Sequence, residues 1–518
     1  MCKLYWTYLL ERVNNPVMAQ VQNSIKRSQN VVVIGAGIGG LSAALRLASL
    51  GNDVRVIEAA SKPGGKIRTR SGANAPIDLG PTVLTLLPVF EKLFSDVGED
   101  FHDHLQVKKQ NVLARHWWHD GTCVDLHASF DISLNNIRKA FGEKSALEFL
   151  SYYSDTQSLF NCFDKPVMQN ANPNLPSMML AVMKQPSVIG KMRPTATLEQ
   201  GLSKQFSDPK LRQLFGRYAT YIGGTPHTAP ALLSLVWQAE AKGVWTIEGG
   251  MHRLAEVLEK LCHAKGVQFT YDCCVRKIES KRDKATHVVL STDEVIQADS
   301  VVFNGDPRAL SLGLLGDNLK NKVPDIADQE RSLSAYVWGF DAQCDGPELV
   351  HHNVFFADEP NSEFHDIMNG HMPSDPTIYV CAQDRGKSST PPKIENFELI
   401  LNAAPLTTRQ PEQKDFDTCN EITFQRLRKF GLSFSGERTR QHLTMPQDFE
   451  RLFPASAGSL YGQSPRGMMA TLKRPKCTTK LKNLFMVGGG VHPGAGIPMA
   501  TLCAELAVAE MRTRQILT

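Results

Sequence analysis

The feature that most constrains this chain is the run from Val31 to Ala59, which reads VVVIGAGIGGLSAALRLASLGNDVRVIEA. Its first four residues are consecutive apolar β-formers, which predict a strand buried on both faces, as in a parallel sheet. Gly35, Gly37 and Gly40 then give G-x-G-x-x-G where this strand must turn into a helix. Such glycines allow a tight turn, close approach of the backbone to a pyrophosphate, and close helix–strand packing. We therefore expect a β–α–β unit that binds a dinucleotide.

Glu58 makes this signature more specific. It follows a second apolar run, residues 54–57, and so lies at the carboxyl end of the next predicted strand. A carboxylate at that point can accept hydrogen bonds from both ribose hydroxyls of an adenosine, whereas it would repel a 2′-phosphate, so NADP is disfavoured. The alternative is a glycine turn followed by a solvated glutamate, and the complete order of strand, turn, helix, strand and acid speaks against it.

The composition is that of a large enzyme rather than a nucleic-acid-binding protein. A chain of 518 residues exceeds the usual span of one core, so two domains are expected. The formal net charge of +4 is small for this length and gives no reason to expect a nucleic acid partner. Eleven cysteines occur without C-x-x-C or zinc-type spacing, which favours reduced thiols, a cytoplasmic location and no metal site.

Two segments bear on membranes. No stretch reaches the ~18 uncharged apolar residues that a spanning helix needs, so any membrane contact must be peripheral. Residues 1–29 lack the apolar region and cleavage site of a signal peptide and are expected to be an N-terminal extension. The methionine-rich stretch LPSMMLAVMKQPSVIGKM, residues 175–192, is either a core helix broken by prolines or an apolar lip with basic edges.

The segment after Glu58 carries a resemblance to a known family. It contains G-G-K-I-R-T, residues 64–69, and D-L-G-P, residues 78–81. These resemble the second FAD signature of the amine-oxidase and carotenoid-desaturase flavoproteins, G-G-[RK]-x-x-T, and the D-x-G-P that follows it there. Lys66 and Arg68 could neutralise the two pyrophosphate charges. Without the resemblance, the doublet would be read as a surface turn with two solvated bases.

The C-terminal stretch LKNLFMVGGGVHPGAGIPMATLCAELAVAEM strengthens this resemblance. It predicts a strand at 484–487, a glycine turn, and a helix that begins near Pro498. A helix amino terminus aimed at the pyrimidine edge of a flavin would stabilise negative charge there. HPGAGIPMA, residues 492–500, is similar to the carotenoid desaturases. Met499 and the segment YGQSPRGMMATLKRP, residues 461–475, resemble their 1-hydroxycarotenoid 3,4-desaturase (methoxyneurosporene dehydrogenase) branch more than the phytoene branch.

The resemblance runs from about Asn30 to Met511 and implies an α/β fold. A Rossmann-like FAD-binding domain of the glutathione-reductase and amine-oxidase type would be interleaved with an α+β substrate domain. Residues 30–95, 226–310 and 466–518 would form the FAD-binding domain, and residues 96–225 and 311–465 the substrate and membrane-facing domain. The FAD contacts are expected at Gly35, Ala36, Gly37, Gly39, Gly40, Glu58, Ala59, Lys66, Gly80, Pro81, Thr82, Val275, Gly488, Gly489 and Met499.

The resemblance also implies the chemistry, which is FAD-dependent desaturation of a C40 carotenoid, with hydride transfer from an allylic carbon. The substrate cation would be delocalised over a polyene, so the neighbouring proton needs only a weak base. His492 is the ionisable residue that the motif places near the flavin and is the catalytic candidate, although a histidine that shapes the turn is equally compatible. Quinone or oxygen would accept the electrons. Peripheral membrane contact through residues 178–192 would suit a substrate that dissolves in bilayers.

Three other functions remain open on the sequence. A phytoene or diapophytoene desaturase would share the same machinery. A flavin-free isoprenoid-lipid carrier of the Rab GDP-dissociation-inhibitor type uses the same fold, and a soluble amine oxidase would need an aromatic cage beside the flavin. The complete cofactor signature, from Gly35 through Glu58 and Lys66 to Met499, favours the carotenoid desaturases. Finally, the dispersed histidines are expected at the surface and not as metal ligands; they are His351, His352, His365 and His371.

Overall fold

The predicted β–α–β unit is present in the computed structural model, which describes residues 28–516 except 327, 387–389, 407–412 and 468–469. Strand β1 (Asn30–Ile34) runs parallel to β2 (Asp53–Ile57), and helix α3 (Ile38–Ser49) connects them. All but the last two residues of the predicted N-terminal extension, and the methionine pair 468–469 of the C-terminal segment, lie outside the described residues.

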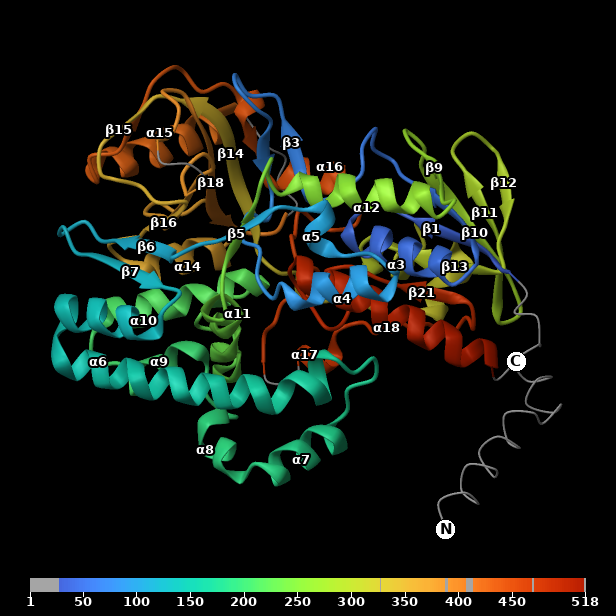
Figure 1. Cartoon of the computed structure of the whole chain (residues 1–518), viewed down its shortest axis with the longest axis horizontal. Coiled ribbons are helices and arrows are strands. Elements are labelled where there is room, and N and C mark those ends of the chain that lie inside the picture. Colours follow the sequence, from blue (N-terminus) through green and yellow to red (C-terminus); the bar gives the residue numbers. More distant parts are fainter. Residues whose placement is uncertain (1–27, 327, 387–389, 407–412, 468–469, 517–518) are drawn as a thin grey trace, which may run out of the picture.

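A five-stranded parallel sheet surrounds this unit, in the order β21-β13-β1-β2-β9. The added strands are β9 (Gln268–Thr270), β13 (Ser300–Phe303) and β21 (Leu484–Met486). Helix α3 packs against both α12 (His252–Ala264) and the C-terminal α18 (Ile497–Ile516). A three-stranded antiparallel sheet contributes to the same core and lies at the right of Figure 1; its strands are β10 (Val275–Lys281), β11 (Lys284–Leu290) and β12 (Val295–Gln297).

A seven-stranded mixed sheet forms the second half of the molecule, at the upper left of Figure 1. Trp338 is fully buried in it and meets Phe424 of the covering helix α15 (Gln413–Lys429) edge to face, with the ring centroids 5.3 Å apart. In order, the strands are β20 (Leu443–Thr444), β14 (Ser334–Ala342), β18 (Glu395–Ala403), β17 (Ile378–Ala382), β16 (His352–Phe355), β6 (Val112–Trp117) and β7 (Cys123–His127).

Below this sheet, a helical layer is built on the long helix α6 (Phe130–Phe163). Its core is aromatic because Phe149, Phe215 and Trp237 pack together from three helices. The other helices of the layer are α9 (Leu198–Gln205), α10 (Pro209–Gly216), α11 (Trp237–Ala241) and the 3₁₀ segments η3 (Arg217–Ile222) and η4 (Ala231–Val236).

The remaining elements are short. Two strand pairs link the halves, β3 (Arg68–Arg70) with β4 (Ile77–Leu79), and β5 (Val107–Lys109) with β8 (Trp245–Ile247). The others are α4 (Pro88–Asp96), α5 (Phe101–His104), η1 (Asp164–Met168), η2 (Pro186–Val188), α13 (Pro307–Ser311), η5 (Asp317–Lys322), β15 (Cys344–Asp345), α14 (Pro360–Met368), β19 (Ser433–Phe434), η6 (Arg440–His442), α16 (Pro446–Leu452) and α17 (Ala470–Lys473).

The methionine-rich stretch is not a core helix. It forms α7 (Leu175–Lys184) and α8 (Ile189–Met192), which project beyond α6 at the bottom of Figure 1, and no residue of α7 is buried. The large apolar side chains exposed on these two helices are Leu175, Met179, Leu180, Met183 and Ile189. We call this set the apolar lip. Among the described residues, no helix is both long and apolar enough to cross a bilayer.

The predicted division of the chain agrees with where the sheets draw their strands. All five parallel strands come from residues 30–95, 226–310 and 466–518, and all seven strands of the mixed sheet come from residues 96–225 and 311–465. Packing differs at one predicted boundary, because Ala229, Trp237 and Val244 belong to the aromatic helical core. The exact domain limits stay a prediction.

Candidate functional site

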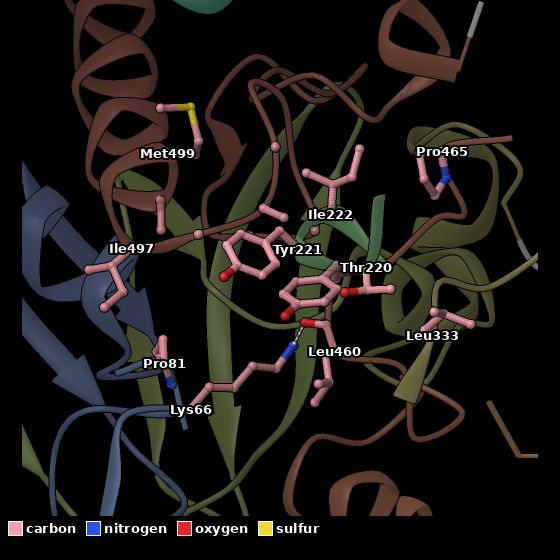
Figure 2. Close-up of a pocket in the computed structure, with 18 of the residues that line it drawn as sticks. Lys66, Pro81, Thr220, Tyr221, Ile222, Leu333, Leu460, Pro465, Ile497 and Met499 are labelled. Carbon is pink, nitrogen blue, oxygen red and sulfur yellow. Dashed lines mark hydrogen bonds between the residues drawn. The ribbon is translucent and has the colours of Figure 1, made fainter. Parts of the chain in front are cut away.

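A deep cavity of about 1070 Å³ lies between the parallel sheet, the mixed sheet and the helical layer. It extends from Glu58, which follows β2, and Val275, which begins β10, to Phe160 and Met178 beside the apolar lip. Most of its wall is apolar. Figure 2 shows a part of the wall near the start of α18, where Lys66, Pro81, Tyr221, Ile497 and Met499 lie around the pocket.

The glycine turn after β1 fits a bound dinucleotide. Gly35 has φ +100°, and a Cβ on Gly39 would come within 2.9 Å of the Gly488 main-chain nitrogen. A Cβ on Gly489, by contrast, would meet nothing within 4 Å, so the cavity wall leaves open space there. Helix α3 begins at this turn, and its N-cap residue Gly37 supplies no side-chain hydrogen bond. The free N–H groups of a helix amino terminus are suited to a pyrophosphate.

Glu58 lies on the cavity wall, at the end of β2, as predicted. Its two carboxylate oxygens accept hydrogen bonds from the main-chain N–H of Ala36, at 2.6 Å, and of Ala60, at 2.8 Å. These bonds fix the orientation of the carboxylate. Because each carboxylate oxygen has two acceptor positions, Glu58 can still accept a ribose hydroxyl.

The two predicted basic residues have different surroundings. Lys66 lines the cavity, donates to the Leu460 carbonyl (Figure 2) and lies 5.4 Å from the Phe453 ring centroid. Burial lowers the pKa of its ammonium to about 8, only partly offset by Asp306. Arg68 does not line the cavity; its guanidinium packs over the ring of Phe449, at 5.6 Å. A pyrophosphate contact from Arg68 is therefore not supported.

The D-x-G-P segment connects the two halves of the molecule. Asp78 accepts hydrogen bonds from the main-chain N–H groups of Met251 and His252 at the start of α12, at 2.6 and 3.2 Å. Gly80 donates to Glu398 of the mixed sheet, at 2.6 Å, and Thr82 is hydrogen-bonded to the Tyr379 hydroxyl, at 2.7 Å. One short segment thus holds the start of α12, in the half with the parallel sheet, against the mixed sheet.

The C-terminal motif forms another part of the cavity wall. Gly488, Gly489 and Met499 all line the cavity, and so does Ile497, the first residue of α18. Arg474, which the sequence reasoning missed, is buried here and donates to the carbonyl of Gly489. A lone arginine in a polar segment gives no signal of such a role.

His492 does not have the surroundings of a catalytic group. It is 2% exposed, does not line the cavity, and its Nε2 lies 2.9 Å from the carbonyl oxygens of both Val167 and Asn170. Burial lowers the pKa of the imidazole to about 4, so it is neutral at pH 7 and donates from Nε2. The structure thus supports the turn-shaping alternative, in which His492 anchors the segment after α6.

The other predicted residues gather at the cavity. Those that line it are Gly35, Gly37, Gly39, Glu58, Ala59, Lys66, Gly80, Pro81, Thr82, Val275, Gly488, Gly489 and Met499. Ala36 and Gly40 act from behind the wall. Ala36 holds Glu58, and a Cβ on Gly40 would lie 2.0 Å from the Gly35 carbonyl oxygen.

Two of the histidines expected at the surface are buried. His365 and His371 are exposed, but His351 and His352 are 6% and 1% exposed, because β16 is covered on both faces. Their rings and the Cys381 thiol have ligand-type atoms within 4.8 Å of one another. Both Nδ1 atoms are already engaged, by the Arg385 carbonyl and the Tyr379 hydroxyl, which explains the cluster as an internal hydrogen-bond network.

Comparisons with known proteins agree with this geometry. Residues 38–342 match the family described as flavin containing amine oxidoreductase. Hydroxyneurosporene desaturase of Cereibacter sphaeroides is 46% identical over 488 residues, which cover 93% of this chain and 98% of that protein. Cyclohexylamine oxidase from Brevibacterium oxydans has a similar structure, with a TM-score of 0.55 at 14% identity over 94% of this chain and 100% of that one. A Rab GDI from Plasmodium falciparum has a TM-score of 0.53 at 12% identity, over 93% of this chain and 98% of that one.

The fold and the cavity define a flavin-containing oxidoreductase of the amine-oxidase fold class. The two structural likenesses show the fold alone, since one is to an oxidase and the other to a Rab GDI. The sequence identity is far more specific. This chain belongs to the hydroxyneurosporene desaturase family, a branch of the flavin-containing carotenoid desaturases.

Replacing Glu58 tests the dinucleotide site. We expect Glu58→Ala to weaken FAD binding by about 10- to 100-fold. The substitution removes the charged acceptor for the ribose and leaves the main-chain N–H groups of Ala36 and Ala60 without an acceptor. Titration of the apoprotein with FAD, followed by quenching of flavin fluorescence, measures this. Glu294→Ala is the control, because Glu294 lies in the turn between β11 and β12, pairs with Arg55 and does not line the cavity. Equal affinities in all three proteins would contradict the assignment.

Replacing His492 separates anchoring from catalysis. The folded protein holds this imidazole neutral down to about pH 4, whereas the unfolded chain protonates it near 6.5. Stability should therefore fall on acidification, and this one group should cost about 2 kcal/mol of unfolding free energy between pH 7 and pH 5. We expect His492→Gln to lose that share of the pH dependence in urea titrations while retaining turnover. Loss of turnover with an unchanged pH dependence of stability would restore the catalytic role.

Proposed function

We propose that this chain is an FAD-dependent desaturase that introduces the 3,4 double bond of a 1-hydroxylated acyclic carotenoid. The observation that carries the proposal is the cavity itself, which joins a dinucleotide-binding turn to a long apolar chamber. Such a chamber suits a hydrocarbon chain, and the relatives named hydroxyneurosporene desaturase support the choice of substrate.

The residues divide the work between holding the cofactor and holding the substrate. The amino terminus of α3 and Gly489 would hold the pyrophosphate, and Glu58 the adenosine ribose. Bound FAD would supply the hydride acceptor. The protein's own task is to exclude water and to align the chain, and the apolar side chains Leu233, Val354 and Phe356 are suited to both.

A weak base is sufficient for the proton that leaves with the hydride, because the substrate cation is stabilised along the polyene. This agrees with a cavity whose acidic groups are engaged by other protein groups. Glu363, for example, is 1% exposed and accepts from Asn402 Nδ2, at 3.0 Å, and from the Thr377 N–H, at 3.1 Å. Quinone and oxygen both remain candidates for the final electron acceptor.

The apolar lip supports peripheral contact with a membrane. Met179 and Met183 are 62% and 73% exposed, while Met178 on the same helix faces inward and lines the cavity. Helix α7 therefore has one side on the chamber and the other in solvent. A lipid-dissolved polyene could pass from a bilayer to the cavity along this helix without crossing water.

Pigment production tests the substrate. The chain would be expressed in a bacterium that has no carotenoids of its own, together with genes for the synthesis of either 1-hydroxyneurosporene or phytoene. The pigments would then be separated by chromatography. We expect a longer chromophore only from the hydroxylated substrate. Conversion of phytoene would move the activity to the earlier step. Conversion of neither substrate by an FAD-loaded protein would contradict the proposal and favour a lipid carrier.

Liposome flotation tests the lip. We expect the triple variant Met179→Ser, Leu180→Ser, Met183→Ser to lose most of its binding to vesicles, because the exposed apolar area that enters the bilayer interface is removed. Leu147→Ser with Leu150→Ser is the matched control, since these side chains of α6 are 58% and 43% exposed outside the lip. Equal flotation of both variants and the unaltered protein would exclude the lip as the membrane contact.

A further inference from the structure

A buried ionic cluster lies in the wall of the apolar chamber, apart from the buried pair of Asp306 and Arg331. Its centre is an ion pair between Arg217 of η3 and Glu240 of α11, in which Nη2 lies 3.5 Å from Oε1. The two side chains are only 8% and 4% exposed. Tyr218 and Tyr221 complete the group, which we call the Arg217 cluster. Arg217, Tyr221 and Glu240 line the cavity, amid apolar neighbours such as Leu232 and Phe356.

The cluster is tightly bonded but incomplete. Tyr218 donates to Glu240 Oε1 at 2.9 Å, and Arg217 Nη1 donates to the Tyr221 hydroxyl. The guanidinium lies over both tyrosine rings, 4.6 and 5.1 Å from their centroids. Arg217 Nε, however, is buried and has no acceptor among the described residues. Because this nitrogen is enclosed by protein atoms, a ligand in the cavity would meet Tyr221 and Glu240 instead.

A purely hydrocarbon ligand would form no hydrogen bond with this cluster. Burying an ion pair costs several kcal/mol per ion, and an unpaired donor adds to that cost, so apolar residues of similar volume would often be as stable. An alternative role for the ion pair is to link η3 to α11 without contacting any ligand. That role does not require the wall of the chamber. A small polar group on the ligand would explain why the cluster lies there.

The cluster is also at the correct end of the chamber. Tyr221 and Tyr379 both line the cavity, and the Tyr379 hydroxyl is bonded to Thr82 at 2.7 Å. Thr82 directly follows the D-L-G-P segment, which is predicted to contact FAD. In Figure 2 Tyr221 lies among Pro81, Lys66 and Ile497, which belong to the predicted cofactor side of the pocket.

We propose that the Arg217 cluster binds the tertiary hydroxyl group of the polyene substrate and so selects both the substrate and the bond that is oxidised. In a 1-hydroxycarotenoid the hydroxyl carbon is two bonds from C3, so holding the hydroxyl fixes the C3–C4 bond within a few ångströms. Tyr221 and Glu240 offer a hydroxyl donor and a carboxylate acceptor at the wall, and these match the acceptor and donor capacities of an alcohol. This inference rests on the proposed function.

Binding measurements with matched ligands test the hydroxyl site. The holoenzyme in detergent would be titrated with the hydroxylated C40 polyene and with the same polyene without the hydroxyl, using quenching of tryptophan fluorescence. We expect the unaltered protein to prefer the alcohol, and Tyr221→Phe to reduce that preference by about tenfold or more. The double variant Arg217→Met with Glu240→Met should abolish the preference while leaving hydrocarbon binding intact, because an apolar pair can replace a buried ion pair without loss of stability.

Glu363→Gln is the control, because Glu363 is another buried acid of the same cavity and both its oxygens are already bonded. A preference within twofold of the original in both Arg217-cluster variants would overturn the inference. The pigment assay reads the proposed function separately. If the unaltered protein converts the hydroxylated polyene but the variants keep their preference, only the hydroxyl site is wrong. If the unaltered protein converts no carotenoid, the proposed function is wrong, whatever the measured preference for the alcohol over the hydrocarbon.

Discussion

The rest of the structure depends on how closely three main-chain segments approach one another around Asn304. Its amide donates to the Gly35 carbonyl, at 3.2 Å, and a Cβ on either Gly37 or Gly488 would lie 2.8 Å from an atom of this side chain. The turns after β1 and β21 can therefore approach Asn304, which follows β13, only because they carry glycine at these positions. This contact brings the start of α3 and the segment leading to α18 to one edge of the sheet, where both face the cavity.

Burial then determines which chemistry the cavity can support. It lowers the pKa of Lys66 to about 8 and raises the pKa of Glu240, so burial opposes the charged form of both side chains. A site of this kind is poorly suited to reactions that develop localised charge in water-like surroundings. It suits hydride removal from a polyene, in which the positive charge spreads over the substrate itself and the protein mainly aligns the reactants.

The two ends of the chamber have complementary roles. At one end, α7 separates solvent from the cavity with a single helix, and this is where we propose that an apolar molecule enters from a bilayer. At the other end, the Arg217 cluster is the place where a polar terminus would be stabilised after it has crossed the apolar section. A substrate with one hydroxylated end would therefore have a preferred direction, which is what places one particular bond at the cofactor turn.

The sequence by itself determined the cofactor half, because local rules act there. G-x-G-x-x-G, Glu58 and the C-terminal glycines each have a backbone or charge requirement that few residue types meet, and these segments meet at one cavity. Only the tertiary structure decided the fate of side chains whose partners are distant in sequence. His492 turns toward the carbonyls of Val167 and Asn170, over 300 residues away, and Arg217 meets Glu240 only because η3 and α11 pack on the same wall. Burial and partner choice are properties of packing, and no local pattern encodes them.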